Sequence, residues 1–373
     1  MKGKAKRQLL KMSTALALVA GGTLGGFQPL TAMPTVSAAT VSQTQAHKQL
    51  QAQLFEALSA HKGSVKITYS VGINELKKAI EPALDAAIDQ DPYIHYTMKG
   101  YAYSLSGNKS SATADVELTY RETAEQSAYV HQQVAAALKQ IVTDDMNDHM
   151  KVKAIHDWVV RTLKYDTTLS KFTAYEGLKT GSTVCQGYAL LTYDMLTQAG
   201  FESNIVEGYV GKEAHAWNMV KLDGKWYQID TTWDDPVPDR GDRVSTSYYL
   251  VTDTELKQDH KWKTANYPKA ATPYSETLEL LIAKGVTGAK ELRTTLGYTA
   301  ASGSVVSTSA VLRQIVQNAS EDGQSSLTFR YQGTKTKLKN DLLTLYSYGF
   351  SPIGYTSKSL GGSNNWQVTL YWT

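Results

Sequence analysis

Three side chains in the middle of the chain have the types that amide chemistry at a thiol requires: Cys185, His215 and Asp230. In such chemistry a thiolate attacks a carbonyl carbon, an imidazole takes and returns the proton, and a carboxylate orients the imidazole. Each residue alone is a weak signal, because a lone histidine is more often structural and an aspartate in "QIDTTW" also suits a turn. Their combination, separated by 30 and 15 residues, predicts a nucleophile, a general base and an orienting acid.

Cys185 is the only cysteine of the 373 residues and lies in "GSTVCQGYALL". A single cysteine cannot form a disulfide within the chain, so it needs another explanation. The pattern from Cys185 to Ala199 predicts a helix that is apolar on almost all sides and ends at Gly200. The first turn of a helix favours a thiolate through its unpaired N–H groups and its dipole. The alternative is an inert, packed thiol.

Three strands are predicted after this helix, and they must position the histidine and the aspartate. The last two, "HAWNMVKL" and "KWYQIDTTW", are joined by Asp-Gly at 223–224, a strong signal for a two-residue hairpin turn. This turn sets Trp217 opposite Asp230 and places His215 on the same face of the hairpin. His215 and Asp230 are then diagonal neighbours, about 7–8 Å apart at the backbone, which their side chains can span.

Three motifs in this region, "VCQGYA", "HAWNMVKLDGKWYQIDTTWDD" and "YYLVTDTELKQDH", resemble the transglutaminase-like superfamily. This is a papain-like group that includes the animal transglutaminases and many exported bacterial proteins. The resemblance covers about residues 124–265, and "KAIHDWVVRTLKYD" is similar to the family's leading helix. It implies an α+β fold with a central helix packed on an antiparallel sheet, and a triad of Cys185, His215 and Asp230.

Papain-like enzymes often use a further side chain to complete the oxyanion hole. Tyr165, Gln186 and Trp217 are the candidates for this role or for shaping the site, and simple packing is the alternative for each. His260 matches a position of the family, and we expect it to be structural. The acidic segment 234–243, "DDPVPDRGDR", lacks the regular oxygen-ligand spacing of a calcium loop. We therefore expect no metal and no cofactor.

The expected activity is acyl transfer from an amide of a peptide or protein to the thiol. Water as the acceptor gives a protease or amidase, which we favour, whereas an amine gives a cross-linking transamidase. A triad does not distinguish the two, because it is the same for both. A different class of protein, a non-catalytic factor that binds the cell wall or another protein with the same fold, is the second alternative. Cell-wall peptides are plausible substrates of an exported protein.

The first 38 residues have the pattern of a signal peptide, with five basic residues before the small and apolar "STALALVAGGTLGG" and no acidic residue. We therefore expect a secreted protein, with association with the cell wall as an alternative, and no transmembrane segment after processing. Removing these five from the 38 Lys and Arg leaves 33 against 35 Asp and Glu, a formal charge of −2. Without a cationic block, nucleic-acid binding is not expected. The oligomeric state stays open.

Two small modules are predicted on either side of the catalytic region. Both read as helix, strand, helix, strand and strand, and we interpret them as a diverged pair of α+β modules. Their aromatic-rich strands would suit wall polymer, but such strands more often only build sheets. After the signal peptide, the predicted parts are an N-terminal module, a catalytic domain, a helical connection and a C-terminal module, over 39–123, 124–270, 271–307 and 308–373.

Overall fold

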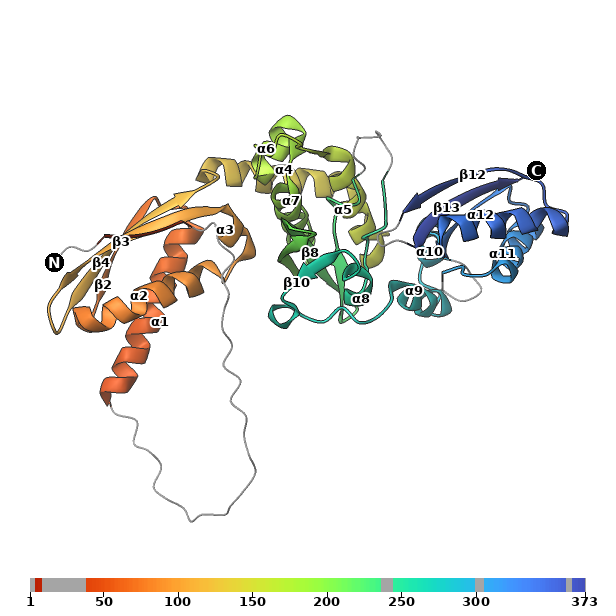
Figure 1. Cartoon of the computed structure of the whole chain (residues 1–373). Helices are drawn as coiled ribbons and strands as arrows, with labels where there is room; N and C mark the ends of the chain where they lie inside the picture. Colours follow the sequence, from red (N-terminus) through yellow and green to blue (C-terminus); the bar gives the residue numbers. More distant parts are fainter. Residues whose placement is uncertain (1–3, 9–37, 236–243, 299–304, 360–363, 373) are drawn as a thin grey trace, which may run out of the picture. The chain divides into compact units, whose positions relative to one another are not determined.

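The computed structural model describes residues 4–8, 38–235, 244–298, 305–359 and 364–372 (Figure 1). Its helices and sheets make an α+β protein. The chain divides into two compact units, residues 1–126 and 127–373. The second unit contains both the central region and the predicted C-terminal module.

The first unit is a sheet with two helices on one face. Its strands lie in the order β1-β3-β4-β2, all antiparallel. Apolar side chains of α1 and α2, such as Leu54 and Ile80, form one core with the sheet residues Ile67 and Val116. A short helix, α3, is an addition to the expected order, and it forms because Asp91 caps its first turn. The elements are α1 (Ala38–Ser59), α2 (Ile73–Ile88), α3 (Pro92–Thr97), β1 (Lys4–Gln8), β2 (Ser64–Tyr69), β3 (Met98–Gly107) and β4 (Ala112–Tyr120).

The C-terminal segment repeats the order of elements that the sequence predicts for both ends of the chain. In its sheet the last strand, β13, lies between β11 and β12, just as β4 lies between β2 and β3 in the first unit. Phe329, Tyr331 and Leu338 belong to a core of its own. The common ancestry of the two modules stays a prediction. The elements are α11 (Ser309–Glu321), β11 (Ser326–Gln332), α12 (Lys335–Thr344), η2 (Leu345–Tyr348), β12 (Pro352–Ser359) and β13 (Asn365–Trp372).

The central region is built on the helix that begins at the single cysteine. This helix, α7 (Cys185–Gln198), packs on β7 and β8 of a sheet with the order β10-β7-β8-β9. Figure 1 labels α7, β8 and β10 of this region. Tyr188, Leu191 and Met195 are completely buried, so the prediction of a central helix is confirmed. The strands are β7 (Ser203–Val210), β8 (Glu213–Leu222), β9 (Lys225–Ile229) and β10 (His260–Trp262).

Smaller elements surround this core. The helices α4 and α5 precede the cysteine segment, and α9 and α10 lie between β10 and the C-terminal segment. Two short strands, β5 and β6, pair in parallel, and β6 leads into the cysteine. The bounds are α4 (Ala124–Ile141), α5 (Asp148–Thr162), β5 (Lys164–Tyr165), α6 (Ala174–Thr180), β6 (Ser182–Thr183), α8 (Asp253–Leu256), η1 (Thr264–Asn266), α9 (Tyr274–Ala283) and α10 (Ala289–Thr295).

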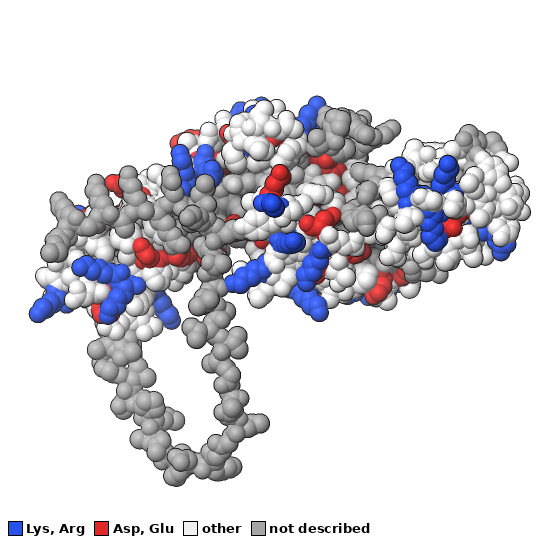
Figure 2. Space-filling view, viewed as in Figure 1, with Lys and Arg blue, Asp and Glu red and all other residues white. Residues whose placement is uncertain are grey.

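Two predictions fall largely outside the described residues. Most of the predicted signal peptide, residues 1–3 and 9–37, lies outside them, while residues 4–8 pair with β3 as strand β1. Residues 236–243 of the acidic segment also lie outside. None of the described helices has the length and apolarity of a membrane span. On the face drawn in Figure 2, basic and acidic side chains are interspersed.

Candidate active site

The cysteine is the first residue of α7, and hydrogen bonds anchor the two residues before it. The N–H of Val184 donates to the carbonyl of Lys171 at 2.9 Å. The hydroxyl of Thr183 donates to the carbonyls of Lys171 and Thr173, at 3.1 and 3.3 Å. Val184 provides no side-chain cap for the helix. The half-buried thiol of Cys185 therefore sits at a fixed helix start where the backbone dipole favours negative charge.

The carbonyl of Lys171 belongs to a loop that one carboxylate organises. The carboxylate of Asp166 accepts from the amides of Thr168, Ser170 and Lys171, at 2.9–3.0 Å. The hydrogen bonds from the Thr168 hydroxyl and from these amides keep the pKa of Asp166 far below its usual value. The N–H of Asp166 in turn donates to the carbonyl of Thr183. The loop is thus fastened to the strand that leads into the cysteine.

A glycine allows this close packing at the first turn of α7. A Cβ on Gly187 would lie 2.1 Å from the hydroxyl oxygen of Thr183 and 2.8 Å from the carbonyl oxygen of Thr173. Both distances are far below van der Waals contact, and the second involves backbone. Gly187 therefore lets the cysteine turn of the helix rest against the residues that anchor it.

The hairpin that carries the histidine has the predicted register. Leu222 pairs with Lys225 across the turn, and the ladder continues to the pair of Asn218 and Ile229. The predicted pairing of Trp217 with Asp230 is wrong, because β9 ends at Ile229. The chain turns out of the sheet there, since the Asp230 carboxylate binds amides further along the chain, described below.

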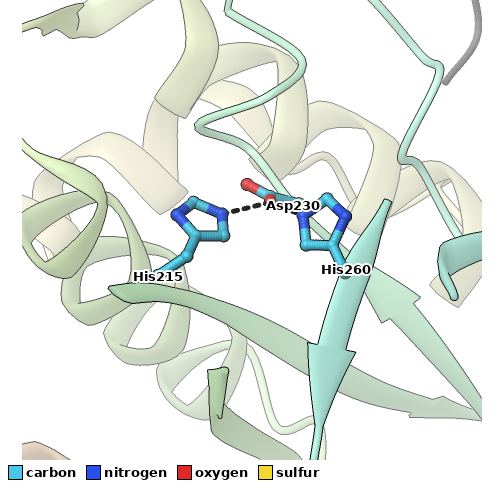
Figure 3. Close-up of side chains that lie close together, drawn as sticks. All are labelled: His215, Asp230 and His260. Atoms are coloured by element: carbon cyan, nitrogen blue, oxygen red, sulfur yellow. Dashed lines mark hydrogen bonds and ion pairs between the residues drawn. The ribbon is translucent and has the colours of Figure 1, made fainter. Parts of the chain in front are cut away.

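The structure nevertheless brings His215 and Asp230 together. Nε2 of His215 lies 2.6 Å from Oδ2 of Asp230, and both side chains are buried (Figure 3). The side chain of Cys185 is near enough to contribute to the raised pKa of His215. Because Nε2 faces the carboxylate, Nδ1 is the ring atom left for the thiol. The three residues expected from the sequence therefore form one series, from sulfur through imidazole to carboxylate.

The electrostatics of the pair favour its ionised form. Burial disfavours a charged imidazole, but the charge of Asp230 and hydrogen bonds to Asp230 and Cys185 outweigh it and raise the pKa of His215 to about 10. Burial alone would raise the pKa of Asp230, yet the charge and hydrogen bond of His215 hold it far below its usual value. At neutral pH the site therefore contains an imidazolium bonded to a carboxylate.

Four donors hold the carboxylate of Asp230. Its Oδ1 accepts from the amides of Thr232 and Trp233, at 2.9 and 3.0 Å. Its Oδ2 accepts from His215 and from Nε2 of His260, which lies 3.1 Å away. Sequence reasoning assigned His260 a structural role and did not place it here. The signal was its position as the last residue of the third family motif, "YYLVTDTELKQDH", but no local pattern shows that β10 returns to Asp230.

The two histidines and the aspartate also satisfy a simple geometric test for a metal site. One ligand atom from each of His215, Asp230 and His260 lies within 4.8 Å of the others. Both rings, however, direct Nε2 at the same carboxylate oxygen at hydrogen-bond distance. A cation among these atoms would have to replace both hydrogen bonds, so protons account better for this cluster.

The region that contains Cys185, His215 and Asp230 is similar to known proteins. A model described as "Transglutaminase-like superfamily" matches residues 135–231, a range that includes Cys185, His215 and Asp230. Residues 135–231 belong to the transglutaminase-like superfamily. The predicted family resemblance is thereby confirmed for this part of the chain.

Two curated relatives match part of this chain. Kyphoscoliosis peptidase of Mus musculus is 28% identical over 169 residues, which is 38% of this chain and 26% of that protein. Kyphoscoliosis peptidase of Homo sapiens is 28% identical over 167 residues, covering 38% and 25%. The chain thus spans about a quarter of the length of these relatives. A crystal structure of a TGase matches at 15% identity and a TM-score of 0.28, covering 35% of this chain and 43% of that one.

The three candidates for an oxyanion or shaping role lie in different surroundings. Burial and the charge of Cys185 raise the pKa of Tyr165, so its phenol near the thiol remains a hydrogen-bond donor. Gln186 is the half-buried second residue of α7. Trp217 is buried, and its indole N–H donates to Oε1 of Gln228 at 2.8 Å. Of the three, Tyr165 is the one whose pKa the charge of Cys185 affects, whereas Trp217 stacks on His215 as a packing residue.

A cavity of about 200 Å³ in the same unit lies away from this centre. It is lined by residues of the central region and of the C-terminal module, among them Tyr248, Arg330 and Asn365. None of the triad residues lines it. The cavity therefore does not define where a substrate meets the transglutaminase-like site.

Proposed function

We propose that this protein is a thiol enzyme that cleaves amide bonds of peptides or proteins through an acyl-enzyme intermediate. The observation that carries the proposal is the position of His215, which bonds to Asp230 at 2.6 Å and whose pKa is raised by Asp230 and by the nearby Cys185. An imidazolium beside a sulfur favours the thiolate as the reacting species. Membership of the transglutaminase-like superfamily supports the same assignment.

In the proposed reaction the sulfur of Cys185 attacks the amide carbon, and electrons move to the carbonyl oxygen. His215 then gives its Nδ1 proton to the departing amine, the C–N bond breaks, and a thioester remains. A water molecule attacks this thioester and gives a proton to His215, which releases the carboxylic acid and the thiolate. Asp230 keeps its charge throughout and orients the ring.

Water is favoured over an amine as the acyl acceptor. The two curated relatives are named peptidases, which supports hydrolysis, although they share only about a quarter of their length with this chain. Transamidation uses the same triad, so it is a second outcome of the test. A binding factor that does not use the thiol is the third.

The test incubates wild-type protein and Cys185→Ala with a glutamine-containing peptide library and a labelled amine, followed by mass spectrometry. We expect cleaved peptides with the wild type and none with Cys185→Ala. Cysteine-dependent incorporation of the amine would assign a transamidase instead. If neither product forms while Cys185 remains accessible to a small alkylator, the enzyme proposal is wrong and the binding factor is favoured.

Export of the protein is a separate proposal. It rests on the basic and then apolar composition of the first 38 residues. Expression in a bacterial host with its secretion system should yield extracellular protein that begins close to Ala39. Recovery of protein that still carries the N-terminal segment in the cytoplasm would contradict this proposal. It would leave the proposed chemistry untouched.

A further inference from the structure

His260 is a buried residue whose two ring nitrogens both face carboxylates. Its Nε2 lies 3.1 Å from Oδ2 of Asp230, and its Nδ1 lies 2.5 Å from Oδ1 of Asp259. A neutral imidazole carries one proton and can donate to only one of them, whereas an imidazolium donates to both. Burial disfavours the charged ring, but the hydrogen bonds to Asp230 and Asp259 outweigh it, so the pKa of His260 is raised.

The second carboxylate is itself held in place. Oδ2 of Asp259 accepts from the hydroxyl of Tyr248 at 2.7 Å. Burial and this hydrogen bond raise the pKa of Tyr248, which therefore stays protonated as a donor. The carbonyl of Tyr248 accepts from the backbone N–H of Asp230 at 3.1 Å. Tyr248, Asp259, His260 and Asp230 thus form a closed ring of hydrogen bonds.

Aromatic side chains fix the plane of the His260 ring. Its centroid lies 5.1 Å from that of Trp217 and 5.2 Å from that of Trp233, both edge-on. The backbone leaves room for this packing at Gly208, where a Cβ would lie 2.5 Å from the Trp217 ring and 2.3 Å from the carbonyl oxygen of Lys261. Because its plane is fixed, the direction of the N–H group that meets Asp230 is fixed as well.

We propose that His260 is a positioning residue that holds Oδ2 of Asp230 in the direction required by His215. This inference rests on the proposed function and extends the triad by His260, Asp259 and Tyr248. The same oxygen accepts from both histidines, so the second one decides where that oxygen points. A residue with only a packing role would fill this space without a charge. Burying another ion costs stability unless it is paired on all sides, as it is here.

The experiment follows the rate at which iodoacetamide alkylates the full chain, from about pH 6 to about pH 9.5, around the ~8.5 at which a free thiol titrates. The chain has one cysteine, so total labelling reports Cys185 alone. The variants are His260→Leu, which removes the N–H donor, His260→Gln, whose amide restores one, and Asp259→Asn, which loosens His260 from its other side. The matched control is His149→Phe, since His149 is also buried and hydrogen-bonded to a carboxylate, that of Asp223.

We expect His260→Leu to slow alkylation near pH 6 by about 10- to 100-fold, the effect of losing a hydrogen bond between buried charges. Near pH 9.5 its rate should approach that of the wild type, because most of any free thiol is then ionised. His260→Gln should recover most of the alkylation rate that His260→Leu loses near pH 6. The rate of Asp259→Asn should lie between those of the wild type and His260→Leu. His149→Phe should lower thermal stability without changing the pH profile.

Two results would overturn the inference about His260. A third result, given last, would instead overturn the proposed function. A folded His260→Leu variant with the wild-type profile removes any positioning role. If that variant does not fold, Asp259→Asn decides, because its side chain is 20% exposed and tolerates change better; a wild-type profile then overturns the inference. If the wild type itself reacts like a free thiol, the proposed function fails, and the role of His260 falls with it.

Discussion

Nε2 of His215 lies 2.6 Å from Oδ2 of Asp230, although both residues lie beyond the last pair of the β8–β9 ladder, Asn218 with Ile229. His215 is 8% exposed and Asp230 1% exposed, so little water competes for this bond. Hydrogen bonds between charged partners are short and about twice as strong as neutral ones. The contact therefore sets both the tautomer and the charge of the imidazole that meets the thiol.

Replacing the carboxylate by an amide tests this role. We expect Asp230→Asn to reduce peptide cleavage about 10²- to 10⁴-fold, because the amide does not stabilise the imidazolium and favours the wrong tautomer. Asp223→Asn is the matched control, since Asp223 also binds a histidine and its left-handed turn conformation suits asparagine. The rates are compared at the same peptide concentration. A fold-change below threefold for Asp230→Asn would remove Asp230 from the mechanism.

The charge on His215 predicts how stability changes at high pH. Its folded-state pKa of about 10 exceeds the ordinary value of 6.5, so the stabilisation is complete below about pH 6.5 and is lost as the pH rises through about 10. The lowered pKa of Asp230 has the opposite sense, so its contribution is lost only in acid. We expect the Tm difference between wild type and His215→Gln to change by on the order of 5 °C between pH 7 and pH 11. A difference independent of pH would show that the ring is neutral in the folded protein.

The close packing at Gly187 predicts a selective effect of one methyl group. A Cβ there meets the side chain of Thr183 and the backbone of Thr173, so Gly187→Ala must displace the first turn of α7. We expect a loss of about 1–3 kcal/mol in the free energy of unfolding. Alkylation of Cys185 should also slow near neutral pH. Gly63→Ala, where a Cβ meets nothing within 4 Å, is the control, and equal effects of the two variants would contradict the packing argument.

The phenol of Tyr165 is expected to stabilise the oxyanion that forms when the thiol attacks. Loss of one such donor lowers kcat by about 100-fold, and we expect a decrease of 10- to 100-fold for Tyr165→Phe with little change in KM. Tyr227→Phe, which removes a buried hydroxyl bonded to Thr277, is the control for loss of a tyrosine hydroxyl elsewhere in the unit. Steady-state kinetics on the cleaved peptide separate kcat from KM. If KM rises and kcat is unchanged, Tyr165 shapes the site and does not act on the transition state.

The sequence was sufficient for the local parts of the site. The apolar run after Cys185 predicts the buried helix, and the Asp-Gly turn at 223–224 predicts the hairpin register, because both signals come from residues close together in the chain. The same signals failed where the chain leaves regular structure. Asp230 lies beyond the ladder because its own carboxylate binds the amides of Thr232 and Trp233 and turns the chain. Such local hydrogen bonds compete with those of the sheet, and the alternation of side chains in the sequence does not reveal them.

By itself, then, the sequence determined the types of the reacting groups, the elements that carry them and the family of the region that contains them. Only the tertiary structure decided that His260 shares an oxygen of Asp230 with His215, that Cys185 raises the pKa of Tyr165, and that the N–H of Trp217 already donates to Gln228. The physical reason is the distance along the chain over which each effect acts. Periodicity and turn chemistry act over a few residues, whereas the charge and hydrogen bonding of a buried group depend on strands that return from 30 or more residues away.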